Sequence, residues 1–368
     1  MSRAYLVLAD GTVFEGKSIG AEGKAVGETV FTTGMTGYVE TLTDPSYYGQ
    51  IVTQTFPLIG NYGVMSEDYE SKKSWVRGYI VRELCEKPSN FRKEKSLGDF
   101  LKEQNIIGIC GIDTRSLTKR LREAGVMNGM IISGTDQRPD ITDSLLNEIK
   151  EYRIEKAVET VTCSEIEINS KDSLKSSDSE KSHHIILWDF GAKKNIQREL
   201  EKRGCHVTVV PGDTKAEQIL ELNPDGIMLS NGPGDPAENT GIIEEIKKLC
   251  EYGKLPIFGI CLGHQMLALA RGAKTAKLKY GHRGGNHPCK DTKTGRVYIT
   301  SQNHGYAVET SSLPDFARLS FVNVNDSTCE GITYSDIPAF SVQFHPEACG
   351  GPHDTNFLFD EFIKMIEG

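Results

Sequence analysis

Residues 255–270 read Leu-Pro-Ile-Phe-Gly-Ile-Cys-Leu-Gly-His-Gln-Met-Leu-Ala-Leu-Ala. The apolar run 255–260 predicts a strand, and residues 265–270 predict a helix. Cys261 lies at the turn between them with Gly259 and Gly263 on either side, where a tight turn leaves little room for a Cβ. This is the layout of a nucleophile elbow, with cysteine where hydrolases of that design carry serine. At the helix N-terminus, the helix dipole would favour the thiolate of Cys261.

A base and its orienting acid are predicted further along the chain, at His345-Pro346-Glu347. The residue before a proline is pushed towards extended geometry, in which positions i and i+2 face the same side. A carboxylate beside an imidazole holds the tautomer of a general base and stabilises its charge. Taken alone, such a cysteine is usually a small buried hydrophobe, and the tripeptide is usually a surface turn. Taken together, the two motifs favour a Cys-His-Glu triad for acyl transfer.

Two other histidines are candidates for the base, His264 and His304. His264 lies three residues after Cys261, so it could share a face of the helix. No acid lies at an orienting distance in sequence from His264. We therefore assign both histidines structural or substrate-adjacent roles.

The region around Cys261 alternates strands and helices. Strands are predicted at 185–188, 206–210, 226–229 and 255–260, and helices at 195–202, 216–222 and 242–251. Repeated βαβ units imply a doubly wound, mostly parallel sheet whose sites gather at the carboxyl ends of its strands. After about residue 277 the pattern becomes hairpin-like, before a final helix at 358–366. Residues 1–155 instead predict a mixed, β-rich domain. The fold class is thus α/β with a β-rich N-terminal domain.

The chain resembles class I glutamine amidotransferases through Gly-Ile-Cys-Leu-Gly-His-Gln at 259–265, His-Pro-Glu at 345–347 and Ser-Asn-Gly-Pro-Gly-Asp-Pro at 230–236. More narrowly, it resembles the small, glutaminase chains of carbamoyl-phosphate synthase. That likeness depends on residues 281–288, 302–306 and 351–354 in the C-terminal half, and on 35–38, 43–47 and 111–115 in the N-terminal half. It covers nearly the full length except a spacer in the middle.

The resemblance implies a function and a set of site residues. Cys261, His345 and Glu347 would hydrolyse L-glutamine to glutamate and ammonia through a γ-glutamyl thioester, with backbone N–H groups of Leu262 and Gly232 meeting the oxyanion. The glutamine site would comprise Ser46, Gly232, Gly234, Leu262, Gln265, Asn303, Gly305 and Tyr306. Ser46 lies in the other domain, so the resemblance implies a substrate bound between domains. Some relatives carry Phe where this chain has Tyr306.

The resemblance also implies a partner. A large synthetase subunit would bind bicarbonate and ATP, carry any divalent metal, and receive the ammonia to make carbamoyl phosphate. We expect no cofactor and no metal in this chain. Two rival functions stay open: a stand-alone cysteine hydrolase of γ-glutamyl compounds, and a catalytically silent regulatory subunit. The presence of Cys261 argues against the second. The sequence does not distinguish arginine from pyrimidine biosynthesis.

Composition limits the remaining function classes. The 368 residues carry a net charge of −9, with 38% hydrophobic and 25% charged residues. No basic excess is available to neutralise phosphates, which argues against nucleic-acid and acidic-membrane binding. The longest apolar runs fall short of the roughly 18 residues of a membrane-spanning helix. Nine cysteines without a Cys-x-x-Cys pair fit reduced thiols, so we expect a cytoplasmic protein.

The predicted domains are 1–155 for docking and a share of the glutamine site, a polar linker at 156–183, and the amidotransferase domain at 184–368. The linker prediction depends on the Ser-, Lys- and acid-rich stretch 162–182, which lacks the apolar residues to order itself well.

Two motifs suggest a phosphate-binding site and a metal site, but the sequence around them does not support either function. Residues 11–18, Gly-Thr-Val-Phe-Glu-Gly-Lys-Ser, satisfy the phosphate-loop pattern, but no helix-forming sequence follows. Asp10-Gly11 instead predicts a hairpin turn. His282, His287 and Cys289 suggest a metal site, yet their spacing matches no known ligand pattern.

Overall fold

The computed structural model describes residues 2–135, 137–169 and 182–368, and these form two compact units, Met1–Glu155 and Lys156–Gly368. Each unit has its own hydrophobic clusters. No described helix is long and apolar enough to cross a membrane.

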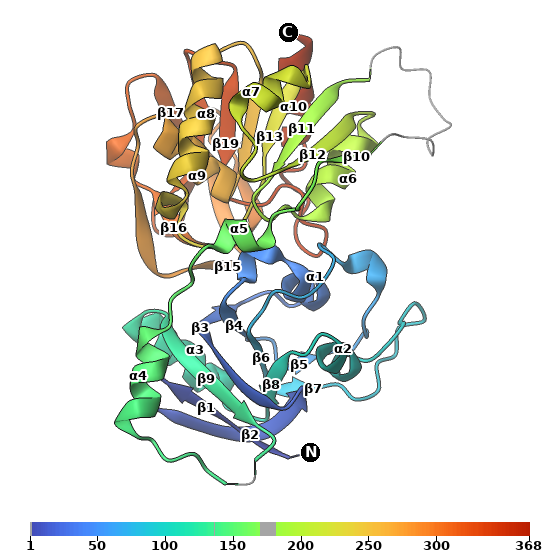
Figure 1. Ribbon diagram of the computed structural model, residues 1–368, viewed down its shortest axis with the longest axis vertical. Helices are drawn as coiled ribbons and strands as arrows, with labels where there is room; N and C mark the ends of the chain where they lie inside the picture. The colour runs from blue at the N-terminus through green and yellow to red at the C-terminus, as the bar shows by residue number, and fades with distance from the viewer. Residues whose placement is uncertain (1, 136, 170–181) are drawn as a thin grey trace. The chain divides into compact units, whose positions relative to one another are not determined.

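The first unit is built on a closed barrel (Figure 1). Its strands follow the order β1-β2-β8-β6-β4-β3-β9, namely Arg3–Leu8, Val13–Gly20, Ile107–Cys110, Gly78–Val81, Gln50–Gln54, Gly23–Thr32 and Met127–Ser133. Side chains of Leu6, Ile51, Ile80 and Ile131 from four of these strands pack into one buried cluster. Closure leaves no exposed sheet edge, so every strand of the barrel is paired on both sides.

Helices and a small sheet complete the first unit. Alternate residues on the barrel strands, such as Val52 and Tyr79, pack outwards against α1 and α2. The helices are α1 (Tyr38–Thr43), α2 (Leu97–Glu103), α3 (Thr114–Ala124) and α4 (Asp143–Glu151), and the small sheet pairs β5 (Leu58–Ile59) with β7 (Glu83–Leu84).

The phosphate-loop pattern at 11–18 is part of a hairpin, as predicted. Asp10 Oδ1 accepts from the backbone N–H of Thr12 at 2.9 Å, and β1 pairs antiparallel with β2. Lys17 and Ser18 lie inside β2, opposite Cys110 and Ile109 of β8. A helix therefore does not begin there, and the feature that would orient backbone N–H groups towards phosphates is missing from this segment.

The second unit has a ten-stranded sheet in the order β10-β12-β11-β13-β14-β19-β18-β17-β15-β16. Strands β12, β11, β13, β14 and β19 run parallel, and the remaining pairs are antiparallel. The parallel core comprises His206–Pro211, His184–Asp189, Gly226–Leu229, Ile257–Ile260 and Ala339–Val342. The others are β10 (Glu167–Asn169), β15 (Thr275–Asp291), β16 (Val297–Val308), β17 (Ala317–Asn323) and β18 (Cys329–Tyr334).

Helices cover both faces of this sheet (Figure 1). Ile186 and Trp188 of β11 pack with α7, α8 and α9, whereas Ile185 and Leu187 pack with α6 and α10. Such alternation of buried residues along one strand is what a parallel sheet between two helical layers requires. The helices are α6 (Lys194–Lys202), α7 (Ala216–Glu221), α8 (Thr240–Tyr252), α9 (Leu262–Ala270) and α10 (Leu358–Glu367). The predicted α/β fold class is confirmed.

The polar linker differs from its prediction over its first part. Residues 156–169 belong to the second unit, where α5 (Ala157–Val161) buries Ala157 and Val158 and β10 pairs with β12. Three buried apolar residues in five explain why this stretch orders. Residues 170–181 of the linker lie outside the described residues.

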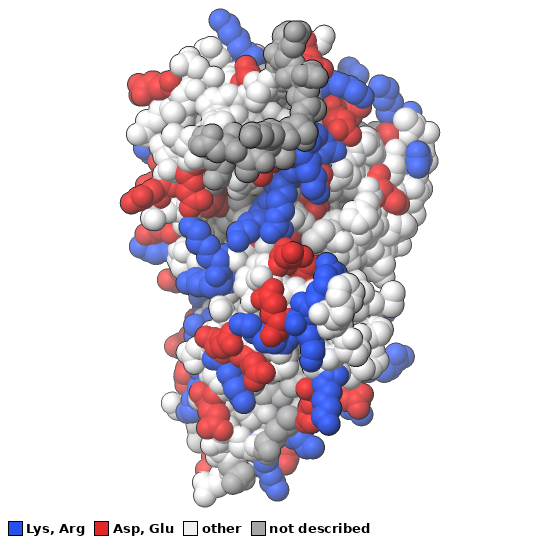
Figure 2. All heavy atoms as spheres, turned by 90° about the vertical axis from the view of Figure 1, so that its right-hand side faces the viewer, with Lys and Arg blue, Asp and Glu red and all other residues white. Residues whose placement is uncertain are grey.

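Acidic and basic side chains are interspersed on the face drawn in Figure 2. This mixture agrees with the modest net charge of −9.

Candidate active site

The nucleophile position is a strained turn. Cys261 has φ 53° and ψ −101° and lies between β14 and α9. A β-carbon makes positive φ costly, so a non-glycine residue held there points to a structurally imposed turn. The backbone N–H of Cys261 donates to the carbonyl of Val342 at 2.9 Å, and its thiol donates to the carbonyl of Asn303 at 3.6 Å.

Both glycines of the elbow are required by close contacts. A Cβ on Gly263 would lie 2.4 Å from the carbonyl oxygen of Leu229, and one on Gly259 would lie 2.9 Å from that of Gly263. These separations are well below van der Waals contact, so neither position accepts a side chain without displacing backbone. The elbow expected from residues 259–263 is therefore present.

The structure brings His345 and Glu347 together beyond β19. His345 Nδ1 lies 2.7 Å from Glu347 Oε1, and both side chains are fully buried. The backbone N–H of His345 donates to Ser301 on β16 at 2.9 Å, which anchors the segment to the sheet. His345 Nε2 is buried and has no hydrogen-bond partner among the described residues. The ring therefore keeps one nitrogen available for the nucleophile.

Charges around His345 favour its protonated form. Burial lowers the pKa of His345 and so does the charge of Lys193, but the Glu347 carboxylate and Cys261 raise it more, to about 9. Burial raises the pKa of Glu347, and the opposing charges of His345 and Lys193 bring it down to about 2. At neutral pH the pair is thus an imidazolium held by a carboxylate.

Lys193 is a member of this cluster that the sequence patterns did not indicate. Its Nζ lies 3.4 Å from Glu347 Oε1, and its side chain is about 10% exposed. Lys193 follows β11 at the N-cap of α6. Its position at the carboxyl end of a parallel strand, where sites of this fold gather, was the available signal.

The loop after β13 approaches the elbow closely. A Cβ on Gly232 would meet the carbonyl oxygen of Phe190 at 2.2 Å and Leu262 Cδ2 at 2.7 Å. Gly234 has φ +88°, which favours glycine. Gly232 therefore lies against Leu262, the residue after Cys261, whereas a Cβ on Gly234 would meet Ala157 at 2.9 Å.

The remaining predicted residues of the second unit come from two elements: Gln265 lies on α9, and Asn303, Gly305 and Tyr306 lie on β16. Gln265 Nε2 donates to the carbonyl of Tyr306 at 2.7 Å, and the Asn303 carbonyl faces Cys261. Gly305 lies between these two residues in the same strand. Ser46 belongs to the first unit, in a turn where Asp44 Oδ1 accepts from its N–H at 2.8 Å. Its share in a glutamine site stays a prediction.

His264 and His304 are buried, and the hydrogen-bond contacts of their rings are to Ser341, to the Tyr306 carbonyl and to Gln302. His264 Nδ1 lies 2.8 Å from Ser341 Oγ, and burial lowers the pKa of His264 to about 3. His304 Nδ1 donates to the Tyr306 carbonyl at 2.7 Å, and burial holds the pKa of His304 well below its usual range. Both rings are neutral hydrogen-bonding groups in the fold.

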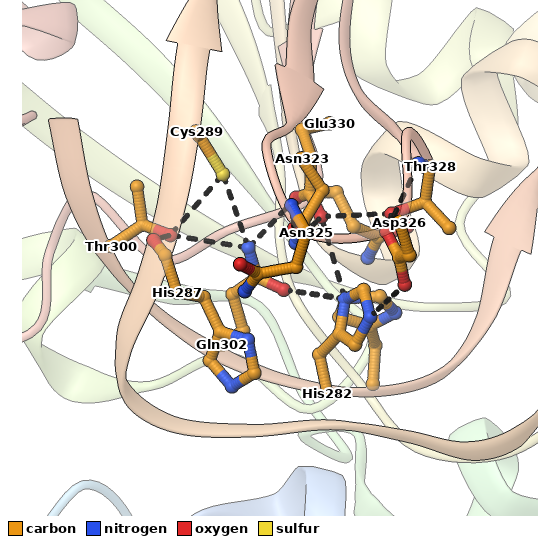
Figure 3. Close-up of polar contacts among 12 residues, drawn as sticks. His282, His287, Cys289, Thr300, Gln302, Asn323, Asn325, Asp326, Thr328 and Glu330 are labelled. Carbon is orange, nitrogen blue, oxygen red and sulfur yellow. Dashed lines mark hydrogen bonds and ion pairs between the residues drawn. The ribbon is translucent and has the colours of Figure 1, made fainter. Parts of the chain in front are cut away.

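The residues that suggested a metal belong to a hydrogen-bonded network (Figure 3). Cys289 Sγ lies 3.4 Å from Thr300 Oγ1 and accepts from Gln302 Nε2 at 3.3 Å. His287 packs against the ring of His282 with centroids 5.1 Å apart. The three side chains therefore do not converge on a single point.

Within the described residues, a different trio has ligand-type atoms within 4.8 Å of one another: His282, His304 and Glu330. Both imidazoles contact Gln302 Oε1, at 2.9 and 3.0 Å, and Gln302 Nε2 donates to Glu330 at 3.0 Å. His282 Nε2 also contacts Asp326 at 2.8 Å. The amide of Gln302 thus lies between the two imidazoles and Glu330, and these groups form one connected polar network. The expectation of no metal stays a prediction.

This fold and the Cys-His-Glu cluster define a class I glutamine amidotransferase, and comparisons with known proteins agree. Residues 186–365 match the family model described as glutamine amidotransferase class-I. Residues 6–131 match the model described as carbamoyl-phosphate synthase small chain, CPSase domain.

Curated relatives that align with nearly the whole chain identify a particular family within this class. The carbamoyl phosphate synthase small chain of Clostridium perfringens is 52% identical, over 98% of this chain and 99% of that protein. The small chain of Listeria monocytogenes serotype 4b is 50% identical, over 100% of this chain and 98% of that protein. The small chain of Fusobacterium nucleatum is 51% identical, over 100% of this chain and 99% of that protein. A solved glutamine amidotransferase from Thermotoga maritima is 19% identical with a TM-score of 0.39, over 51% of this chain and 85% of that one. The chain belongs to the carbamoyl phosphate synthase small chain family.

Proposed function

We propose that this chain hydrolyses L-glutamine and supplies ammonia to a large synthetase subunit that makes carbamoyl phosphate. The observation that carries the proposal is the buried Cys261, His345 and Glu347 cluster, with a 2.7 Å contact between imidazole and carboxylate. A strained cysteine beside a protonated histidine is suited to attack an amide carbon and to protonate the departing nitrogen.

The reaction has two stages. The thiolate of Cys261 attacks the side-chain amide carbon of glutamine, and the negative charge moves to the amide oxygen. The backbone N–H groups of Leu262 and Gly232 meet this oxyanion. The tetrahedral adduct collapses as His345 donates a proton to the nitrogen, so the C–N bond breaks and ammonia leaves. Water, deprotonated by His345, then cleaves the thioester to glutamate and regenerates the thiol.

Substrate contacts are proposed from the family resemblance. They are Ser46, Gly232, Gly234, Leu262, Gln265, Asn303, Gly305 and Tyr306. ATP and a divalent metal are assigned to the large subunit, because the resemblance gives this chain only the glutaminase half. A cytoplasmic location and the docking role of residues 1–155 also stay predictions. The match of residues 6–131 to a small-chain domain supports a partner over a stand-alone hydrolase.

A trapping experiment tests the chemistry directly. The complex isolated from its own host is incubated with an electrophilic glutamine analogue, then digested and analysed by mass spectrometry. We expect one adduct on the peptide containing Cys261, together with loss of ammonia release from glutamine. Labelling of other cysteines with Cys261 unmodified would contradict the proposal.

A further inference from the structure

We propose that Gln343 is a positioning residue of the glutamine site, acting through the side-chain amide of Gln265. This inference rests on the proposed function. Gln343 directly follows β19 and precedes His345 by two residues, and its side chain is fully buried. A buried amide with a specific partner orients that partner as well as filling space.

The contacts fix the orientation of both amides. Gln265 Nε2 donates to the main-chain carbonyl of Tyr306 at 2.7 Å and to Gln343 Oε1 at 2.9 Å. A main-chain carbonyl can only accept, so the atom of Gln265 that faces Tyr306 must be the nitrogen. Both of its hydrogens are then committed, and the Gln265 oxygen is the atom left to accept from another group.

The same reasoning orients Gln343. If its amide were reversed, its NH2 group would face the NH2 group of Gln265, and two donors would meet. Gln343 Nε2 is therefore directed away from Gln265, where it is buried and meets no acceptor among the described residues. Leaving a buried donor unpaired is costly. Within the part of the chain that the structure describes, Gln343 Nε2 is unpaired while Gln343 Oε1 keeps its contact with Gln265.

Gln343 joins the elements that carry the site. The backbone N–H of Gln265 donates to the Cys261 carbonyl at 3.1 Å, so Gln265 lies one turn into α9 beyond the nucleophile. Tyr306 lies on β16, and Gln343 extends β19 towards His345. Without the Gln343 oxygen, the Gln265 amide keeps only the Tyr306 contact. With one contact instead of two, the amide can turn about the Tyr306 contact and move its oxygen away from the position where the substrate needs an acceptor.

The expected effect falls on binding, because the triad has its own supports. Cys261 is held by Val342, and His345 by Glu347 and Ser301. Gln343→Met keeps the length of the side chain and removes the acceptor. In the isolated complex, we expect the KM for glutamine to rise about three- to tenfold, the effect of one hydrogen bond, with kcat within about twofold.

A double-mutant cycle separates positioning from packing. In a Gln265→Met background no amide remains to be oriented, so Gln343→Met should add no further rise in KM. Gln197→Met is the control: it makes the same substitution on α6, where Gln197 Nε2 donates to Glu201 at 2.8 Å, and should leave KM unchanged. Gln343→Asn withdraws the acceptor by one methylene and should raise KM equally, so it replaces the Met variant if that variant does not fold.

Two results would overturn the inference: an unchanged KM in both Gln343 variants, or an equal rise in KM with and without Gln265. Failure of the proposed function is seen separately, in the unsubstituted complex, as an absence of glutamine-dependent ammonia release.

Discussion

The charge on His345 depends on three neighbours of opposing effect. Glu347 and Cys261 favour the imidazolium, whereas Lys193 and burial disfavour it, and the first pair prevails. A pKa of about 9 in the fold against about 6.5 in an unfolded chain means that the proton stabilises the folded state. That stabilisation is complete below about pH 6.5 and is lost as the pH rises through about 9.

The first prediction concerns pH. The imidazolium is the acid that protonates the departing ammonia, so kcat should fall as the pH rises through about 9. Glu347→Gln removes the carboxylate, and burial and Lys193 then lower the pKa of His345. We expect the alkaline limb of kcat to move down by more than one pH unit and kcat at pH 7.5 to fall at least about 100-fold. An alkaline limb that stays near pH 9 in this variant would contradict the electrostatic assignment.

The second prediction separates the histidines. His345→Asn should lower kcat by about 100- to 10,000-fold, because no other base accompanies Cys261. His264→Asn changes a neutral ring bonded to Ser341 and should cost less than about tenfold in kcat. Steady-state glutaminase assays on both variants, with their melting temperatures, measure this. A greater loss of activity in a folded His264 variant would refute the assignment of the base.

Among the residues of the site, the sequence predicted those whose positions depend on neighbours in the sequence. Cys261 stands between a strand and a helix, and His345 and Glu347 are separated by one residue, so short-range periodicity was sufficient. Lys193 precedes Cys261 by 68 residues in the sequence, and Gln343 follows it by 82. The pairing of parallel strands brings both residues to the same region of the fold. A single sequence does not reveal such pairing, so Lys193 was not placed beside the triad. Gln343 is two residues from His345, but the contact of its side chain with Gln265 depends on the packing of β19 against α9.

The elbow is the element that positions the nucleophile, and the third prediction tests its packing. Gly263→Ala places a Cβ 2.4 Å from the Leu229 carbonyl, and such overpacking costs about 1–3 kcal/mol of unfolding free energy. We expect a lower melting temperature and a large loss of glutaminase activity, since Cys261 must shift with the helix.

Gly241→Ala is the matched control. Gly241 is also the second residue of a helix, α8, but a Cβ there would meet nothing within 4 Å. Since alanine favours helix over glycine, we expect stability to be unchanged or higher by up to about 1 kcal/mol. Thermal unfolding and glutaminase assays on both variants provide the comparison. Equal tolerance at the two positions would contradict the close approach of α9 to β13.

Elements with local signals were predicted well. The helices predicted at 195–202 and 216–222 agree with α6 and α7 to within one residue at each end, because amphipathic periodicity is a short-range property. Barrel closure was not foreseen. It joins β9 to β1 and β3 across more than 95 residues, and register over such distances is set by tertiary packing.

For the whole molecule, the fourth prediction concerns Ser46 of the first unit. If its hydroxyl binds glutamine, Ser46→Ala removes about one hydrogen bond, and the KM should rise several-fold with little change in melting temperature. Ser46→Phe should raise it further by steric exclusion. Unchanged kinetics in both variants would confine glutamine to the second unit and leave the first a docking role.

We propose that this chain releases ammonia from glutamine and that its partner uses the ammonia for synthesis. The variant Cys261→Ala in the intact complex tests this proposal most directly. Carbamoyl phosphate synthesis is measured with glutamine and, separately, with ammonia. We expect glutamine-dependent synthesis to fall to background, because no thioester can form, while ammonia-dependent synthesis stays within about twofold of the unsubstituted complex. Retained glutamine-dependent synthesis, or loss of both activities in a folded complex, would contradict the assignment of Cys261 as the glutaminase nucleophile.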